Sequence, residues 1–96
     1  MARRKTMTLS ITRFIQLAYI IRLLTGMGPL DIINALRSGN LKDSLWEMAT
    51  GIFSRLEADG ISIAVEGVFV TFLLEWFKRM ARSKQLIRIG PVRVTV

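Results

Sequence analysis

Two stretches of the chain are strongly apolar, and their spacing predicts two long helices. The first covers about residues 9 to 25, is apolar around most of its circumference, and has Thr8 or Ser10 as its N-cap and Gly26 as its C-terminal stop. The second covers about residues 61 to 82 and ends in aromatic and basic residues. We expect these helices to pack antiparallel, with the second stretch as the element around which the chain is organised.

Between these stretches, the pattern predicts two shorter connecting helices. Pro29 is expected at the first position of a helix over 29 to 37. Asn40 is then the expected N-cap of a helix over 41 to 58, with Asp43 in the position of a capping box. One face of this third helix is apolar and the other carries charges of both signs, so one face should be buried. Its expected apolar face consists of Leu45, Met48, Ile52, Phe53 and Leu56.

The last twelve residues or so have the composition of a β-strand rather than of a helix. Apolar, mostly β-branched residues alternate there with polar ones, and Gly90 and Pro91 interrupt them. The sequence therefore predicts an all-α domain over 1–84 and a C-terminal extended β arm over 85–96. A lone strand leaves backbone groups without partners, so we expect the arm to pair with a neighbouring subunit. The predicted self-association residues are Ile87, Ile89, Val92, Val94 and Val96.

The apolar run from 61 to 77 also has some features of a membrane segment. Trp76 and Phe77 followed by basic residues resemble an interfacial belt, but the run is shorter than the roughly 20 residues that a spanning helix needs. Glu66 inside it would be costly in lipid, which favours a helix buried in protein. At the start of the chain, Arg13 and Arg22 interrupt the apolar run that follows the basic cluster. We therefore expect no cleaved signal peptide.

Glu66 needs a partner if it lies on a helix that is apolar on both sides. Arg13 or Arg22 on the first helix are the candidates, and we predict a buried ion pair between Glu66 and Arg22 that fixes the register of the two helices. The alternative is that Glu66 reaches solvent.

Charge is unevenly distributed along the chain, whose formal net charge is +7. All seven acidic residues lie between Asp31 and Glu75, and both ends are purely basic. If the chain folds back on itself, the ends form one positive pole that attracts nucleic acid phosphates or anionic lipid headgroups. The alternative is that these charges only confer solubility. The predicted polyanion-contacting residues are Arg3, Arg4, Lys5, Lys78, Arg79, Arg82, Lys84, Arg88 and Arg93.

Residues for catalysis are scarce. The chain has no cysteine and no histidine, which removes thiolate chemistry and the commonest general base and metal ligand at neutral pH. No glycine-rich phosphate loop occurs either. We expect no enzyme activity, no metal site and no cofactor.

Three functions remain open. The hydrophobic fraction is 51%, more than a chain of this size readily buries, which favours a homo-oligomeric structural protein. The most concrete form is a small virion coat or shell subunit with basic ends facing nucleic acid or lipid. The alternatives are an accessory subunit of a membrane complex with one marginal transmembrane helix, and a basic nucleic-acid-binding module. The expected location is the virion or a membrane.

Overall fold

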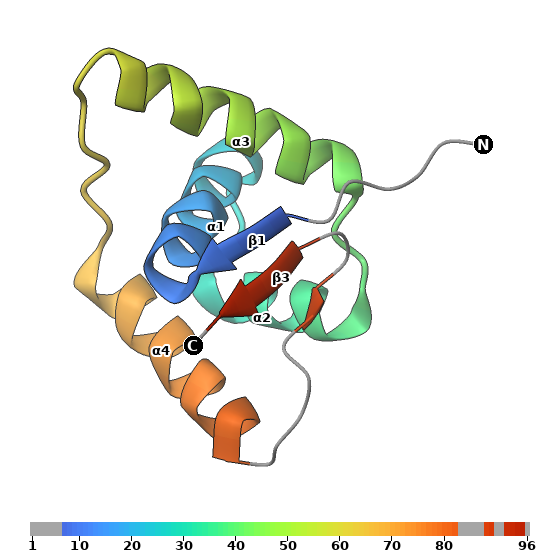
Figure 1. Cartoon of the computed structure of the whole chain (residues 1–96). Coiled ribbons are helices and arrows are strands. Elements are labelled where there is room, and N and C mark those ends of the chain that lie inside the picture. Colours follow the sequence, from blue (N-terminus) through green and yellow to red (C-terminus); the bar gives the residue numbers. More distant parts are fainter. Residues whose placement is uncertain (1–6, 83–87, 90–91, 96) are drawn as a thin grey trace.

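The computed structural model describes residues 7–82, 88–89 and 92–95 (Figure 1). The chain is mainly helical, as predicted, and adds a small sheet. Along the sequence the elements are β1 (Met7–Ser10), α1 (Ile11–Thr25), α2 (Pro29–Ser38), α3 (Asp43–Ala58), α4 (Gly67–Arg82), β2 (Arg88–Ile89) and β3 (Val92–Thr95). The predicted hairpin of two long apolar helices is not confirmed, because α1 packs mainly on α3 while α4 packs mainly on α2.

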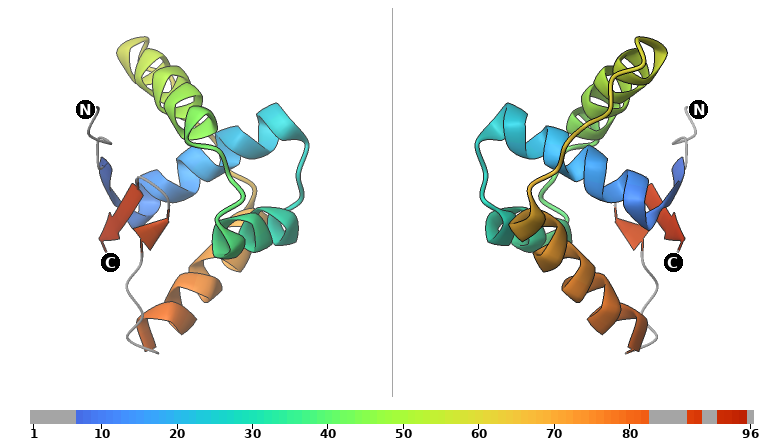
Figure 2. Two further views of the ribbon diagram at one scale, coloured as in Figure 1. Left: turned by 90° about the vertical axis from the view of Figure 1, so that its right-hand side faces the viewer. Right: turned by 90° about the vertical axis from the view of Figure 1, so that its left-hand side faces the viewer.

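Helix α1 lies at the centre of the fold. Figure 2 shows α3 crossing it on one side, α2 and α4 on the other, and the sheet at its N-terminal end. Its Phe14 ring is 5.2 Å from the Trp46 ring of α3 and 5.1 Å from the Phe77 ring of α4. The chain is thus organised around α1 and not, as predicted, around the apolar stretch over 61 to 82. The buried residues of α1 are Phe14, Ile15, Leu17, Ala18, Tyr19, Ile20 and Ile21.

The predicted boundaries of the first two helices are largely confirmed. Ser10 is the N-cap of α1, where its Oγ accepts a hydrogen bond of 3.3 Å from the backbone N–H of Arg13. Gly26 ends the helix with a φ of 74°, a conformation that favours glycine. Pro29 stands at the start of α2, and the Asp31 carboxylate accepts a hydrogen bond of 3.4 Å from the N–H of Gly28.

The start of the third helix differs from the prediction. Helix α3 begins at Asp43 after Lys42, and no side chain caps it. Asn40 is not its N-cap, because the N–H of Asn40 donates to the Ala35 carbonyl and helps to end α2. The predicted apolar face is also shifted. Trp46 is fully buried, whereas Met48 is 53% exposed.

The predicted helix over 61 to 82 begins only at Gly67. Residues 61 to 66 have no regular secondary structure and link α3 to α4. Their alternating pattern explains this outcome, since Ile63 and Val65 pack partly against the core while their neighbours are exposed. A period of two in β-branched residues suits extended backbone better than helix.

The sheet joins the two ends of the described chain. Strand β3 pairs in parallel with β1, from Met7 opposite Val92 to Ser10 opposite Thr95, and antiparallel with β2. The expectation that the C-terminal strand has no partner in its own chain is therefore wrong. Strand β1 was missed because it is only four residues long and runs directly into α1, so its residues were assigned to the helix start.

Candidate functional site

A groove between α2 and α4 combines exposed apolar side chains with charged ones. Leu30 is 58% exposed and Phe72 is 39% exposed. Val68, one turn before Phe72 on α4, is 62% exposed. Figure 2 shows α2 and α4 side by side below α1. The groove is lined by Leu30, Ile33, Asn34, Arg37, Phe72, Glu75, Trp76 and Arg79.

Charges of both signs lie in the same groove. Glu75 is one turn from Arg79 on α4, and Arg37 lines the groove from α2. Within the described part of the chain, no hydrogen bond or ion pair joins Glu75 to either arginine. The groove thus presents apolar side chains together with a carboxylate and two guanidinium groups that are available to a binding partner.

Sequence analysis missed this groove, although a signal was present. Val68, Phe72 and Trp76 recur every four residues on one face of α4, and Phe69, Leu73 and Phe77 recur on the adjacent, buried face. A helix with two apolar stripes can bury one stripe in its own core and still present the other. The spacing of the second stripe could have identified the exposed surface.

The structure brings Arg22 and Glu66 together, but not in a buried environment. Arg22 Nη1 lies 3.7 Å from Glu66 Oε1, and the side chain of Glu66 is 52% exposed. The hydroxyl of Tyr19 donates to the same carboxylate oxygen over 3.3 Å. The prediction of burial is wrong because Glu66 precedes α4 rather than lying within an apolar helix. Arg13 instead pairs with Glu57 over 3.1 Å.

The predicted polyanion-contacting residues fall into two described groups. Lys78, Arg79 and Arg82 are exposed on the last turns of α4. Arg93 is exposed on β3, and Arg88 is its backbone partner on β2. Because β1 pairs with β3, the two ends of the described chain lie next to each other. The remaining predicted residues, which lie outside the described residues, are Arg3, Arg4, Lys5 and Lys84.

The predicted self-association arm is partly engaged in the chain's own core. Val92 is fully buried and Val94 is 6% exposed. Ile89 lies in β2, opposite Val92 in the antiparallel register. Ile87 and Val96 lie outside the described residues. The latching of a neighbouring subunit by this arm stays a prediction.

Neither a metal centre nor a membrane-crossing helix is found in the described part of the chain. The described ranges contain no group of three or more acidic side chains placed to hold a metal ion. None of the four described helices combines the length and the apolar character needed to cross a bilayer.

Comparisons with known proteins add no further constraint. Comparison with protein-family models, curated proteins and solved structures gives no significant match. The functional argument therefore rests on the surfaces of this chain alone.

Proposed function

We propose that this protein is a non-enzymatic structural subunit that self-associates through the groove between α2 and α4. The observation that carries the proposal is the exposure of Leu30 and Phe72 beside Ile33 and Trp76, which belong to the core or pack against it. Contiguous apolar surface of this kind is typical of protein–protein contact sites.

The charges in the groove favour a second copy of the same chain as the occupant. In a two-fold contact, each surface patch meets its own copy, so residue pairs occur twice. Glu75 of one copy can then face Arg37 or Arg79 of the other, and the reverse pair forms as well. This complementarity uses a carboxylate and two arginines that have no partner of opposite charge among the described residues.

The class of structural protein we propose is a coat or shell subunit of a virion. An apolar contact surface between copies and a basic side are the two features that a shell around a polyanion requires. In this proposal the apolar groove joins the subunits, and the basic side faces the enclosed nucleic acid or anionic lipid.

The groove can be tested by comparing two exposed apolar side chains. We expect Phe72→Ser to raise the concentration needed for self-association by roughly tenfold or more, because a central apolar contact is lost. Met48→Ser is the matched control, since Met48 is 53% exposed but lies on α3 outside the groove. Size-exclusion chromatography with light scattering over a concentration series measures the effect, and negative-stain microscopy shows whether regular particles form.

A charge-swap pair tests the two-fold arrangement. Glu75→Lys should weaken self-association by placing like charges in contact, and so should Arg37→Glu combined with Arg79→Glu. An equimolar mixture of the two variants should recover association, because every charged contact is then complementary. A wild-type protein that stays monomeric at all concentrations, or equal effects of Phe72→Ser and Met48→Ser, would contradict the proposal.

A further inference from the structure

The outer face of the three-stranded sheet is a second surface with a distinct chemistry. Met7, Leu9 and the valines of β3 pack against the core, so the alternate residues of the same strands point away from it. Figure 2 shows that no described helix covers this outer face. The exposed residues of β1 and β3 are Thr8, Ser10, Arg93 and Thr95.

The strands of this sheet come from segments that contain no acidic residue. The first acidic residue of the chain is Asp31 and the last is Glu75, so all three strands lie outside the acidic interval. Arg88 and Arg93 occupy directly opposed positions of the antiparallel pair. The Arg93 side chain is exposed on β3, and none of the three strands carries an acidic residue, so an anion can approach it without repulsion from the strands.

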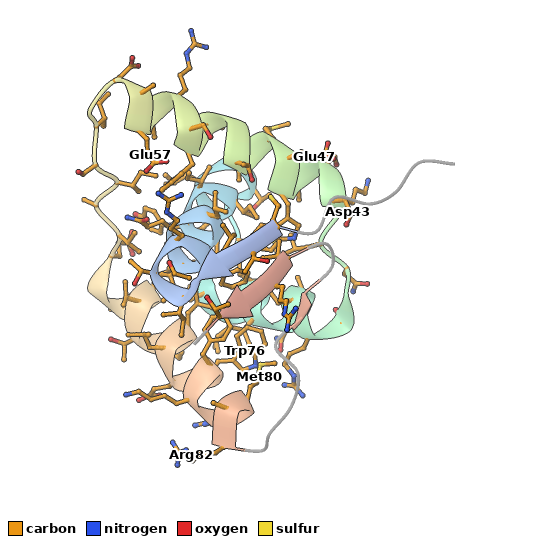
Figure 3. All side chains as sticks on the ribbon, in the orientation of Figure 1. Asp43, Glu47, Glu57, Trp76, Met80 and Arg82 are labelled. Carbon is orange, nitrogen blue, oxygen red and sulfur yellow. The ribbon has the colours of Figure 1, made fainter. Side chains whose placement is uncertain are left out.

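The charges of the neighbouring helices show on which side of the sheet the basic surface continues. Figures 2 and 3 show that the C-terminal end of α4, with Arg82, reaches the side of the molecule on which the sheet lies. In contrast, Asp43 and Glu47 on the first turns of α3 lie at the opposite margin of the sheet (Figure 3). The positive surface therefore extends from β3 toward the end of α4 and not toward α3.

We infer that the outer face of the sheet, extended by the end of α4, binds the phosphodiester backbone of double-stranded nucleic acid without sequence preference. Guanidinium and hydroxyl groups are the usual partners of phosphate oxygens. The described outer face carries no aliphatic side chain for insertion into a membrane and no aromatic side chain for stacking on unpaired bases. These properties favour a duplex backbone over lipid and over single strands.

This inference rests on the proposed function in one respect, because it specifies the polyanion that the basic side of the subunit would face. The two can fail separately. Binding is therefore measured both with the wild-type protein and with the Phe72→Ser variant, whose self-association is expected to be weak.

The test is the salt dependence of binding to a labelled DNA duplex of mixed sequence, followed by fluorescence anisotropy. Arg93→Gln and Arg82→Gln should each weaken binding roughly threefold to tenfold and lower the slope of log affinity against log salt by about 1. Arg55→Gln, an equal charge change on an exposed residue of α3, should leave both quantities nearly unchanged. Thr8→Arg adds a cation opposite Arg93 in the parallel register and should raise both.

The possible results either support or overturn the inference. Loss with Arg93→Gln and gain with Thr8→Arg, at equal affinity for unrelated duplex sequences, support the inference. Equal losses for Arg93→Gln and Arg55→Gln would show that only net charge matters and would overturn it. Binding to vesicles containing phosphatidylserine without binding to duplex DNA would assign the face to a membrane and would also overturn it. Circular dichroism of each variant establishes that the fold is retained.

Discussion

Helices α1 and α4 are both strongly apolar, yet the fold covers them differently. Seven residues of α1 are buried by α3, by α2 and α4, and by the sheet, and only Leu23 and Leu24 among its large apolar residues are exposed, both at its C-terminal end. Helix α4 buries only the stripe of Phe69, Leu73 and Phe77, and its neighbouring stripe of Val68 and Phe72 is exposed. The apolar content of a helix therefore does not show whether its own chain buries it. Apart from its last turn, α1 is covered by its own chain, whereas α4 leaves an apolar stripe exposed.

The difference between the two helices can be tested most directly by truncating one phenylalanine in each of them. Phe14 of α1 is fully buried between Trp46 and Phe77. We expect Phe14→Ala to lower the free energy of unfolding by about 3 to 5 kcal/mol, because it opens a cavity where three helices meet. Urea denaturation followed by circular dichroism measures the change.

The matched control for Phe14→Ala is Phe72→Ala on α4. Phe72 is 39% exposed, so its truncation in the monomer should cost about 1 kcal/mol or less. Similar losses of unfolding free energy for the two variants would contradict the proposed difference between the helices.

A second prediction concerns the cover that β3 gives to the start of α1. Val92 is fully buried, and Val92→Thr would place a hydroxyl of nearly the same shape in an apolar site. We expect a loss of about 1 to 3 kcal/mol in unfolding free energy from the buried, unsatisfied hydroxyl. Thr8→Val on the exposed face of the paired strand β1 is the control, with an expected change of roughly 0.5 kcal/mol. A neutral Val92→Thr would mean that β3 is not part of the core in solution.

The smallest effect is expected for the ion pair between Arg22 of α1 and Glu66, which directly precedes α4. Arg22 and Glu66 lie 3.7 Å apart in a partly exposed pair. A double-mutant cycle with Arg22→Gln and Glu66→Gln should give a coupling of about 0.2 to 1 kcal/mol that decreases with added salt. Thermal unfolding at low and high salt measures it. A coupling of several kcal/mol would instead indicate a buried pair, as the sequence predicted.

Sequence patterns predicted the elements whose determinants are local. Ser10, Gly26 and Pro29 act through the backbone within one helical turn, so α1 and the start of α2 were placed correctly. The third helix was also found, although Asn40 was assigned to its start instead of to the end of α2. Such signals depend on nearest neighbours and need no knowledge of the rest of the fold.

The errors arose where partners distant in the sequence decide the structure. Strand β1 is stabilised by residues 85 positions away, from Met7 opposite Val92 onward, and four residues carry little signal of their own. The segment over 61 to 66 was read as helix because its apolar character was counted and its period of two was not. The groove between α2 and α4 needs two helices at once, so neither Leu30 nor Phe72 marked it alone.

The pairing of β1 with β3 has a consequence for the link over 61 to 66. The part of the chain before this link contains β1 and the part after it contains β3, so the pairing of these strands holds the two parts together. A single backbone cut in the link would separate the two parts covalently and leave them joined by strand pairing and by the ring contacts of Phe14 with Phe77 and of Tyr19 with Phe69. The molecule is in this sense two fragments that contribute to one shared core.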